Sequence, residues 1–285
     1  MTQTEKRTAL VLGAGGLVGA GWATGVLQGL ADAGTDLTTA DLIVGSSAGA
    51  VVGARIAAGE RSLDELYAEQ VSGGVTEPAA RLGPGSVLRY ALAVLTSRTP
   101  EAYGRKLGRL ALRARTVDEA ARRATVAERL GTTTAWPGRR LLVTAVDAAS
   151  GELAVYDADS GVPLVDAVTA SCAIPGAWPP ATIDGRRWID GGIHSTANAH
   201  LAAGHDRVVV IAPTALGNKV VLSPARQGAD LAATGARVEV IVPDAASRAA
   251  FGGRALDPAR TPAAARAGRA QAAAHAEAVA ADWTD

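Results

Sequence analysis

A strand, a sharp turn and a helix meet at the pentapeptide GSSAG, residues 45–49, and no other feature constrains the fold of this chain as tightly. The apolar run DLIV before it has the length of a buried strand, and AGAVVGARIAA after it is apolar on nearly every face, as in a buried helix. Small residues are needed two positions before and two after the central serine, because larger side chains would collide across such a turn. We therefore predict a nucleophile elbow with Ser47 at its tip and Gly45 and Gly49 on either side.

The chemistry of Ser47 depends on this context. An elbow serine stands at the N-terminus of the following helix, where the helix dipole and free N–H groups favour a developing negative charge. An inert serine on a tight strand-to-helix turn is the alternative that the pentapeptide alone leaves open, since G-x-S-x-G arises by chance in chains rich in Gly, Ala and Ser.

A glycine-rich turn, GAGGLVG at residues 13–19, follows the first apolar run of the chain, TALVL. Backbone without side chains can aim consecutive N–H groups at one point, which makes an anion site. Dinucleotide binding is one use of such a site and requires the spacing G-x-G-x-x-G. When Gly13 and Gly15 are taken as the first two glycines, the place of the third is occupied by Val18, so the spacing fails. An oxyanion hole for acyl transfer is the use that an elbow serine favours. Close packing of a helix on a strand explains one or two of these glycines but not all of them.

Asp190, followed by two glycines, ends a short apolar run, so this carboxylate lies on a sharp turn. A carboxylate there could accept the serine proton directly if it lies within hydrogen-bond distance of Oγ. Asp-Gly-Gly is also a common turn sequence. His194 offers a different base, because Ser, Asp and His follow one another in this order in α/β-hydrolase triads. In that fold the acid and the histidine come from separate loops, whereas Asp190 and His194 are only four positions apart.

Strand and helix patterns alternate along the chain, which predicts an α/β fold with a parallel or mixed sheet covered on both faces. We expect one domain over residues 1–285, a three-layer α/β/α arrangement around a mostly parallel sheet, with a helical insertion at about residues 72–137. Capping-box patterns at Ser62 and Thr116 predict two helix starts, and the Ala-rich tail at residues 262–281 predicts one amphipathic helix. Further strands are predicted at residues 140–146, 153–156, 182–189 (with a hairpin turn at Asp184-Gly185), 207–212 and 237–242.

The expected insertion is rich in basic residues, which allow two interpretations. One is a solvated helical face, and the other is a cap over a pocket that handles anionic head groups. The basic residues are Arg81, Arg89, Arg98, Arg105, Lys106, Arg109, Arg113 and Arg115.

The charge balance argues against nucleic acid as a partner, and the cysteine content indicates the cellular compartment. The chain has 28 Lys and Arg against 28 Asp and Glu, so it lacks the basic excess that nucleic-acid binding needs. Its one cysteine, Cys172, excludes an internal disulfide and suits a reducing cytoplasm, where we expect the protein. The first apolar run stops at a glycine cluster and lacks a cleavage region, so we expect a strand there rather than a signal peptide. We also predict no transmembrane helix.

Taken together and in this order, the glycine turn, the elbow and the Asp-Gly-Gly turn resemble the patatin-like phospholipases. That family has a glycine-rich oxyanion loop after the first strand, a G-x-S-x-G elbow and a distant D-G-G or D-G-A aspartate. Residues 169–180, TASCAIPGAWPP, also resemble the family segment A-S-x-A-x-P-x-x-F/W-P-P. The resemblance covers roughly residues 8–59 and 140–212.

The resemblance implies that Ser47 attacks an ester carbonyl with Asp190 as general base, in a dyad that requires no histidine. It also implies that the turn at Gly13, Gly15 and Gly16 holds the oxyanion. The expected substrate is a fatty-acyl ester or a phospholipid, with no cofactor and no metal, and local basic patches leave a peripheral membrane contact open. An acyltransferase with the same nucleophile and a catalytically weak lipid-binding protein are the alternatives. Oligomeric state, acyl-chain length and head group do not follow from the sequence.

The glycine turn also departs from the family pattern, which usually reads G-G-G-x-R/K-G. Here Ala14 replaces a glycine and Val18 replaces the basic residue. The peptide N–H groups survive both changes, so an oxyanion hole can still form. With Val18 in place of Arg or Lys, the turn lacks the positive charge that the family has there. Trp22, just beyond, could fill the space of the missing basic side chain.

Overall fold

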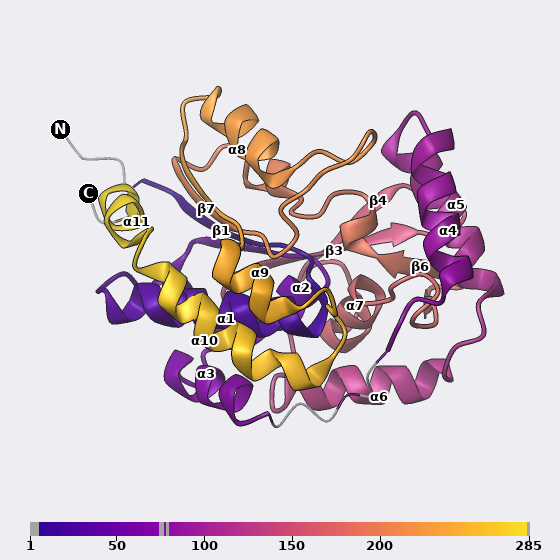
Figure 1. The fold of residues 1–285 in the computed structure, drawn as a ribbon, viewed down its shortest axis with the longest axis horizontal. Coiled ribbons are helices and arrows are strands. Elements are labelled where there is room, and N and C mark those ends of the chain that lie inside the picture. Colours follow the sequence, from indigo (N-terminus) through magenta and orange to yellow (C-terminus); the bar gives the residue numbers. More distant parts are fainter. Residues whose placement is uncertain (1–5, 74–76, 78–79, 284–285) are drawn as a thin grey trace.

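An eight-stranded mixed sheet forms the middle layer of the computed structural model, which describes residues 6–73, 77 and 80–283 (Figure 1). Its strand order is β5-β6-β3-β2-β1-β7-β8, with β4 also paired to β3. Pairs from β3 through β2, β1 and β7 to β8 are parallel, whereas β4, β5 and β6 add antiparallel pairs. The strands are β1 (Thr8–Leu12), β2 (Leu42–Gly45), β3 (Arg140–Asp147), β4 (Leu153–Tyr156), β5 (Ala181–Ile183), β6 (Arg186–Asp190), β7 (Arg207–Ile211) and β8 (Arg237–Ile241).

Helices cover both faces of this sheet. Short 3-10 turns lie at Leu37–Thr39 (η1), Gly191–Ile193 (η2), Ala199–Ala202 (η3) and Pro258–Arg260 (η4). The α-helices are α1 (Gly16–Asp32), α2 (Ala48–Ala58), α3 (Leu63–Ser72), α4 (Pro84–Thr96), α5 (Pro100–Arg113), α6 (Glu119–Leu130), α7 (Leu164–Ser171), α8 (Pro224–Ala232), α9 (Ala245–Phe251), α10 (Thr261–Ala272) and α11 (Ala276–Trp283).

Successive side chains of a strand point to opposite faces, and each face of the sheet has its own core. On β1, Leu10 and Leu12 join the core that α1, α2, α7 and α10 cover. Ala9 and Val11 join the core on the other face, beneath η3 and α8. All four side chains are fully buried, as a central strand of a parallel sheet requires. The predicted α/β class with three layers is therefore confirmed.

Local sequence signals predicted several boundaries correctly. β1 and α2 begin and end at the expected residues. The capping box of Ser62 and Glu65 forms at the start of α3. Asp184 and Gly185 both have positive φ, as the hairpin turn between β5 and β6 requires.

Two predictions about helices are wrong. The helix expected from Thr116 begins instead at Glu119, because the Asp118 side chain accepts hydrogen bonds from two N–H groups of its first turn. The tail forms two helices, α10 and α11, rather than one. Between them His275 Nδ1 lies 2.7 Å from Glu239 Oε1, and this contact with β8 anchors the junction to the sheet.

Helices α4, α5 and α6 fall within the stretch where the sequence predicts an insertion. α4 and α5 stand side by side at one edge of the molecule (Figure 1). α5 packs against β3, β6 and η2, while α6 packs against α2 and α7. Of these helices, α5 therefore borders the end of β6, where Asp190 lies.

Candidate active site

Ser47 occupies the turn between β2 and α2, as the sequence predicts. Its φ of 54° and ψ of −117° lie in a region that residues other than glycine rarely adopt. Space requires the flanking glycines: a Cβ on Gly45 would lie 2.6 Å from Ala50 Cα, and one on Gly49 would lie 1.9 Å from Leu12 O. The turn therefore has the strained geometry of a nucleophile elbow.

Asp190 ends β6, and its carboxylate points at the elbow serine. Ser47 Oγ donates a hydrogen bond of 2.6 Å to Asp190 Oδ2. The other carboxylate oxygen, Oδ1, accepts the N–H of Gly192 at 2.8 Å. Both side chains are buried. The fold thus brings the two residues singled out in the sequence into direct contact.

Burial dominates the electrostatics of Asp190. Loss of solvent raises the pKa of its carboxyl to about 7, although hydrogen bonds from Ser47 and Gly192 and the charge of Arg122 act to lower it. A carboxyl whose pKa lies near neutrality can both accept and return a proton at physiological pH.

The end of α7 and the segment that follows it hold both residues in place. Ser171 Oγ accepts the N–H of Ser47 at 2.8 Å, and the Cys172 thiol donates to the carbonyl oxygen of Ser47 at 3.3 Å. The carbonyl oxygen of Ala173 accepts the N–H of Asp190 at 3.0 Å. Burial raises the pKa of the Cys172 thiol to about 12, so it stays protonated. The ASCAIP segment therefore positions the serine and the aspartate relative to each other.

Asn198 links the elbow to the turn after Asp190, and no signal in the sequence revealed it. Its amide nitrogen donates to Ser46 Oγ at 2.8 Å and to the carbonyl oxygen of Gly191 at 3.2 Å. Ser46 Oγ also lies 2.7 Å from Thr144 Oγ1 on β3. Asn198 is fully buried and has a φ of 54°, a conformation that Asn adopts more readily than most residues.

Removing the Asn198 amide should loosen both the elbow at Ser47 and the turn after Asp190. We expect Asn198→Ala to lower the free energy of unfolding by about 2–4 kcal/mol, because buried acceptors lose their donor, and to lower kcat more than it raises KM. Asn198→Gly is the matched variant, because glycine removes the same amide without strain at positive φ. Denaturant unfolding and ester hydrolysis measure the two effects. A glycine variant as stable as the wild type would contradict this role of the amide.

Gly16 of the glycine turn lies at the pocket of Ser47, but the N–H of Gly13 is not free to serve an oxyanion. The N–H of Gly13 donates to a carbonyl of β7 at 2.9 Å and is not available to an oxyanion, contrary to the expectation from the sequence. The N–H groups of Gly15 and Gly16 have no backbone acceptor within the described residues, nor has that of Ala48 at the start of α2. Gly16 and Ala48 line the same small pocket as Ser47.

The positively charged side chains at this pocket come from α6 and not from the glycine turn. Val18 is fully buried in the core. Arg122 and Arg129 line the pocket at Ser47 instead. Arg122 Nη1 donates to Glu77 Oε1 at 2.5 Å, and Arg129 Nη1 lies 3.2 Å from Glu77 Oε2. Sequence reasoning missed these arginines, because a basic residue on an amphipathic helix is usually solvated.

His194 and Trp22 lie away from the contact between serine and aspartate. In the described part of the chain, the carboxylate of Asp190 has the elbow serine and one backbone N–H as its hydrogen-bond partners. His194 lines a separate cavity of about 300 Å³ together with His200. Trp22 is fully buried toward α9, where its Nε1 donates to Ser247 Oγ at 3.0 Å. The geometry therefore favours a dyad over a triad.

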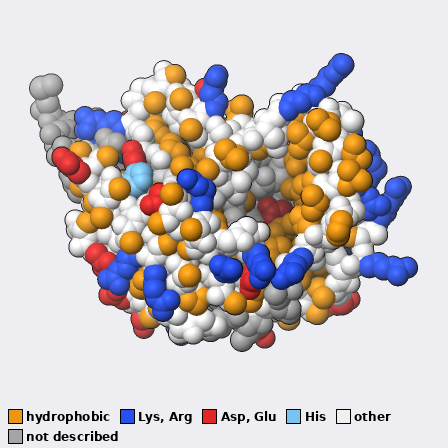
Figure 2. Space-filling model, in the orientation of Figure 1, with side chains coloured by type: hydrophobic (Ala, Val, Ile, Leu, Met, Phe, Trp, Pro, Cys, Tyr) orange, Lys and Arg blue, Asp and Glu red, His pale blue; other side chains and the backbone are white. Residues whose placement is uncertain are grey.

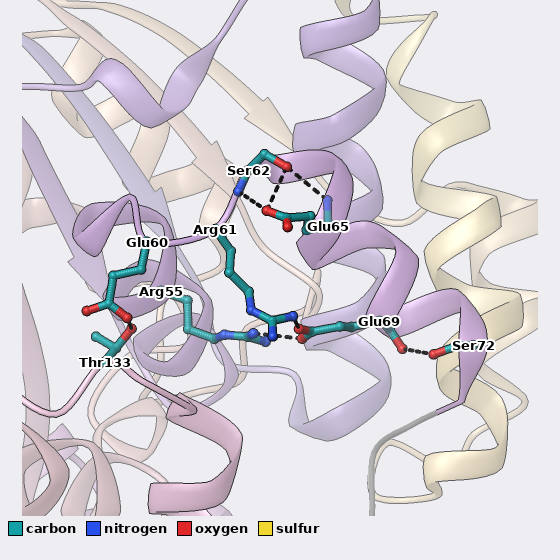
Figure 3. Close-up of polar contacts among 8 residues, drawn as sticks. All are labelled: Arg55, Glu60, Arg61, Ser62, Glu65, Glu69, Ser72 and Thr133. Atoms are coloured by element: carbon teal, nitrogen blue, oxygen red, sulfur yellow. Dashed lines mark hydrogen bonds and ion pairs between the residues drawn. The ribbon is translucent and has the colours of Figure 1, made fainter.

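A larger cavity of about 380 Å³ lies beside the Ser47 pocket and shares Leu17 and Arg129 with it. Apolar side chains of α1 and α2 form part of its wall. Its rim is polar: Figure 3 shows Arg55 and Arg61 both directed at Glu69 of α3, with which they form ion pairs. This cavity offers room next to a pocket that is itself small.

The fold is that of a three-layer α/β protein, in which an elbow serine after β2 and an aspartate at the end of β6 share a buried hydrogen bond. The family model described as patatin-like phospholipase matches residues 10–203, and the chain belongs to this family. Among solved structures, the chain is similar to VipD from Legionella pneumophila, with a TM-score of 0.39 and 15% identity, covering 67% of this chain and 46% of that one. It is also similar to the type III effector protein ExoU, with a TM-score of 0.42 and 16% identity, covering 98% of this chain and 54% of that one. The chain spans about half the length of these two proteins, and no curated protein matches it.

In the described ranges, none of the helices has the length and apolar content that crossing a bilayer takes. The same residues contain no cluster of three or more His, Cys, Asp or Glu side chains that could bind a metal ion.

Proposed function

We propose that this protein is a serine-dependent lipid acyl hydrolase that cleaves fatty-acyl esters through an acyl-enzyme on Ser47, with Asp190 as general base. The observation that carries the proposal is the buried hydrogen bond of 2.6 Å from Ser47 Oγ to Asp190 Oδ2. A serine nucleophile needs a proton acceptor at that distance, and a carboxyl with a pKa of about 7 is suited to the task.

In the proposed first half-reaction, Ser47 Oγ attacks the ester carbonyl carbon while its proton passes to Asp190 Oδ2. The N–H groups of Gly15, Gly16 and Ala48 stabilise the negative charge on the carbonyl oxygen. The bond to the leaving alcohol then breaks, and Asp190 returns its proton to the oxygen of that alcohol. Water attacks the acyl-enzyme in the second half-reaction, giving one proton to Asp190, which passes it back to Ser47 Oγ.

The surroundings of the pocket favour an ester that carries an anionic group, such as the phosphate of a phospholipid. Arg122 and Arg129 together face one carboxylate, that of Glu77, so this cluster keeps a net positive charge. Guanidinium groups bind phosphate through paired hydrogen bonds. Membership of a phospholipase family supports the same class of substrate.

A fluorophosphonate probe tests the nucleophile. We expect the wild type to be labelled and the labelling to vanish in Ser47→Ala, because the serine oxygen forms the bond to phosphorus. Ser160→Ala, which alters an exposed serine between β4 and α7, is the matched control and should label like the wild type. Labelling that survives Ser47→Ala, or a wild type that takes no label, would sink the proposal.

Activity should also rise with pH through neutrality. Asp190 accepts a proton only when it is ionised, and its pKa is about 7. We therefore expect kcat/KM for a soluble short-chain ester to rise about tenfold per pH unit below pH 7 and to level off above it. Initial rates in buffers of constant ionic strength give the profile. A rate already at its plateau at pH 5 would contradict the assignment of the base.

A further inference from the structure

Helix α4 has one side that packs on the protein and an apolar side that the described residues leave uncovered. Tyr90 and Ala93 point inward and pack with side chains of α5. Leu88, Leu92 and Leu95 point outward and are 59%, 48% and 67% exposed. They recur at the i, i+4 and i+7 spacing that places residues on one stripe of a helix. We call this exposed stripe of three leucines the α4 face.

Basic side chains surround the α4 face. Residues 80–117 contain eight Lys or Arg and one acidic residue, Glu101, which gives a net charge of +7 (8 − 1) in a chain whose total is zero. Between α4 and α5 a groove of about 230 Å³ brings four of these basic residues together with Leu92. They are Arg89, Lys106, Arg109 and Arg113.

Figure 2 shows hydrophobic side chains gathered over α4 and α5, with Lys and Arg at the outer rim and a hollow in the surface beside them. The loop after β7 reaches the same place, because Lys219 Nζ donates to the carbonyl oxygen of Leu95 at 3.0 Å. That loop also carries Leu216, which is 81% exposed. A second segment thus adds an apolar and a basic side chain to this side of the molecule.

The inward side of α4, opposite the α4 face, contacts a segment of the Ser47 pocket. Tyr90 Oη donates to the carbonyl oxygen of Pro175 at 3.2 Å. Ile174 and Trp178, on the same segment as Pro175, line the pocket at Ser47. A partner bound to the α4 face is therefore separated by one helix from the segment that forms one wall of the pocket.

We propose that the α4 face is a membrane-docking surface for bilayers that contain anionic lipids. Helix α4 lies in the plane of the interface, its leucines enter the boundary between head groups and acyl chains, and the surrounding Lys and Arg meet lipid phosphates. The proposal goes beyond ester hydrolysis, because binding through this face requires neither Ser47 nor Asp190.

An anionic bilayer suits both the exposed leucines and the basic side chains of this surface, whereas other partners suit only one of the two. Nucleic acid would satisfy the basic side chains but would set the leucines against a charged backbone. A second copy of the chain would cover the leucines but would bring two regions of net charge +7 together. A bilayer offers apolar depth beneath a negatively charged surface.

Vesicle flotation tests the proposal with the full chain carrying Ser47→Ala, so that no lipid is hydrolysed and the result does not depend on the proposed function. One set of vesicles is phosphatidylcholine, and the other contains phosphatidylglycerol as well. We expect the protein to float with the anionic vesicles and to remain free with the neutral ones at the same lipid concentration.

Two variants separate the apolar contribution from the charged one. Changing Leu88, Leu92 and Leu95 together to Gln should weaken binding to anionic vesicles by about tenfold or more, because the buried apolar area is lost. Arg89→Gln with Arg109→Gln should weaken it by about twenty-five-fold, since each basic residue near an anionic surface contributes about fivefold. The matched control is Arg139→Gln with Arg266→Gln, two exposed arginines outside residues 80–117, and it should bind like the parent. Thermal unfolding checks that every variant is folded.

Several results would overturn the proposal. They are equal binding to neutral and anionic vesicles, no binding to either, unchanged affinity in the leucine variant, or an equal loss in the control pair. Sedimentation velocity that shows a dimer dissociated by the leucine substitutions would also overturn it, because the α4 face would then bind a second copy.

Discussion

Asp190→Asn should abolish ester hydrolysis and, at the same time, make the protein more stable above neutral pH. The amide keeps the shape of the carboxyl: its oxygen can accept the N–H of Gly192, and its nitrogen can donate to Ser47 Oγ. It cannot take the serine proton. We therefore expect kcat/KM to fall by about 10²–10⁴-fold, the usual contribution of general acid–base catalysis.

The gain in stability follows from the raised pKa of Asp190. The folded-state value of about 7 lies above the ordinary value of 3.8, so the folded protein binds this proton more tightly than the unfolded chain. The stabilisation from protonated Asp190 is present in full below pH 3.8 and is lost as the pH rises through about 7. By pH 8 the loss amounts to about 4 kcal/mol, and the Asn variant escapes it.

Unfolding by urea at pH 4 and pH 8 measures this difference. The free energy of unfolding of Asp190→Asn minus that of the wild type should be positive at pH 8 and close to zero at pH 4. Asp184→Asn is the matched control, because this exposed turn residue has positive φ, which Asn also favours. An Asp190→Asn variant with near wild-type turnover would show that the base lies elsewhere.

Arg122→Met should destabilise the protein by about 3–5 kcal/mol, because the buried carboxylate of Glu77 then keeps, among the described residues, only Arg129 as an ion-pair partner. The Arg122 side chain is 3% exposed and that of Glu77 1%. The guanidinium carbon also lies 4.1 Å from the centre of the Trp178 ring, a contact that methionine replaces only in part. The pH profile of activity should move to higher pH as well, because the charge of Arg122 lowers the pKa of Asp190.

Arg123→Met, one position along α6, is the matched control. Arg123 pairs with Asp166 at the surface, with 49% of its side chain exposed, and such pairs contribute about 0–1 kcal/mol. In the double variant Arg122→Met with Glu77→Gln, part of the lost stability should return, because the buried carboxylate is then gone and, within the described part of the chain, only Arg129, which is more exposed than Glu77, loses an ion-pair partner. Chemical denaturation of the four proteins in this cycle gives the coupling. An Arg122→Met loss no larger than that of Arg123→Met would contradict the buried ion pair.

Short motifs predicted local structure well, because their constraints act between neighbours in the chain. The elbow at Ser47 and the hairpin turn at Asp184 are fixed by which backbone conformations the adjacent residues allow. Patterns of the same kind misplaced the start of α6, since Thr116 and Asp118 are both good caps and only packing selects one. That residues 72–137 form a cap over the site stays a prediction.

Contacts between distant segments were invisible in the sequence. Asn198 donates to Ser46 from 152 positions away in the chain, and Arg122 is buried although its helix has the charge pattern of a solvated one. The N–H of Gly13 was expected to face an oxyanion, yet the neighbouring strand β7 takes it into the sheet. Each of these outcomes depends on which segments become neighbours in space.

The sequence by itself determined that Ser47 sits on an elbow, because sterics across five residues require Gly45 and Gly49 there. It also limited the proton acceptor to Asp190 or a nearby histidine. Only the tertiary structure favours Asp190 over the histidine, because β6 ends so that the carboxylate lies 2.6 Å from the serine oxygen. Burial then raised the pKa of that carboxyl toward neutrality, an effect that depends on the surrounding protein and not on the residue itself.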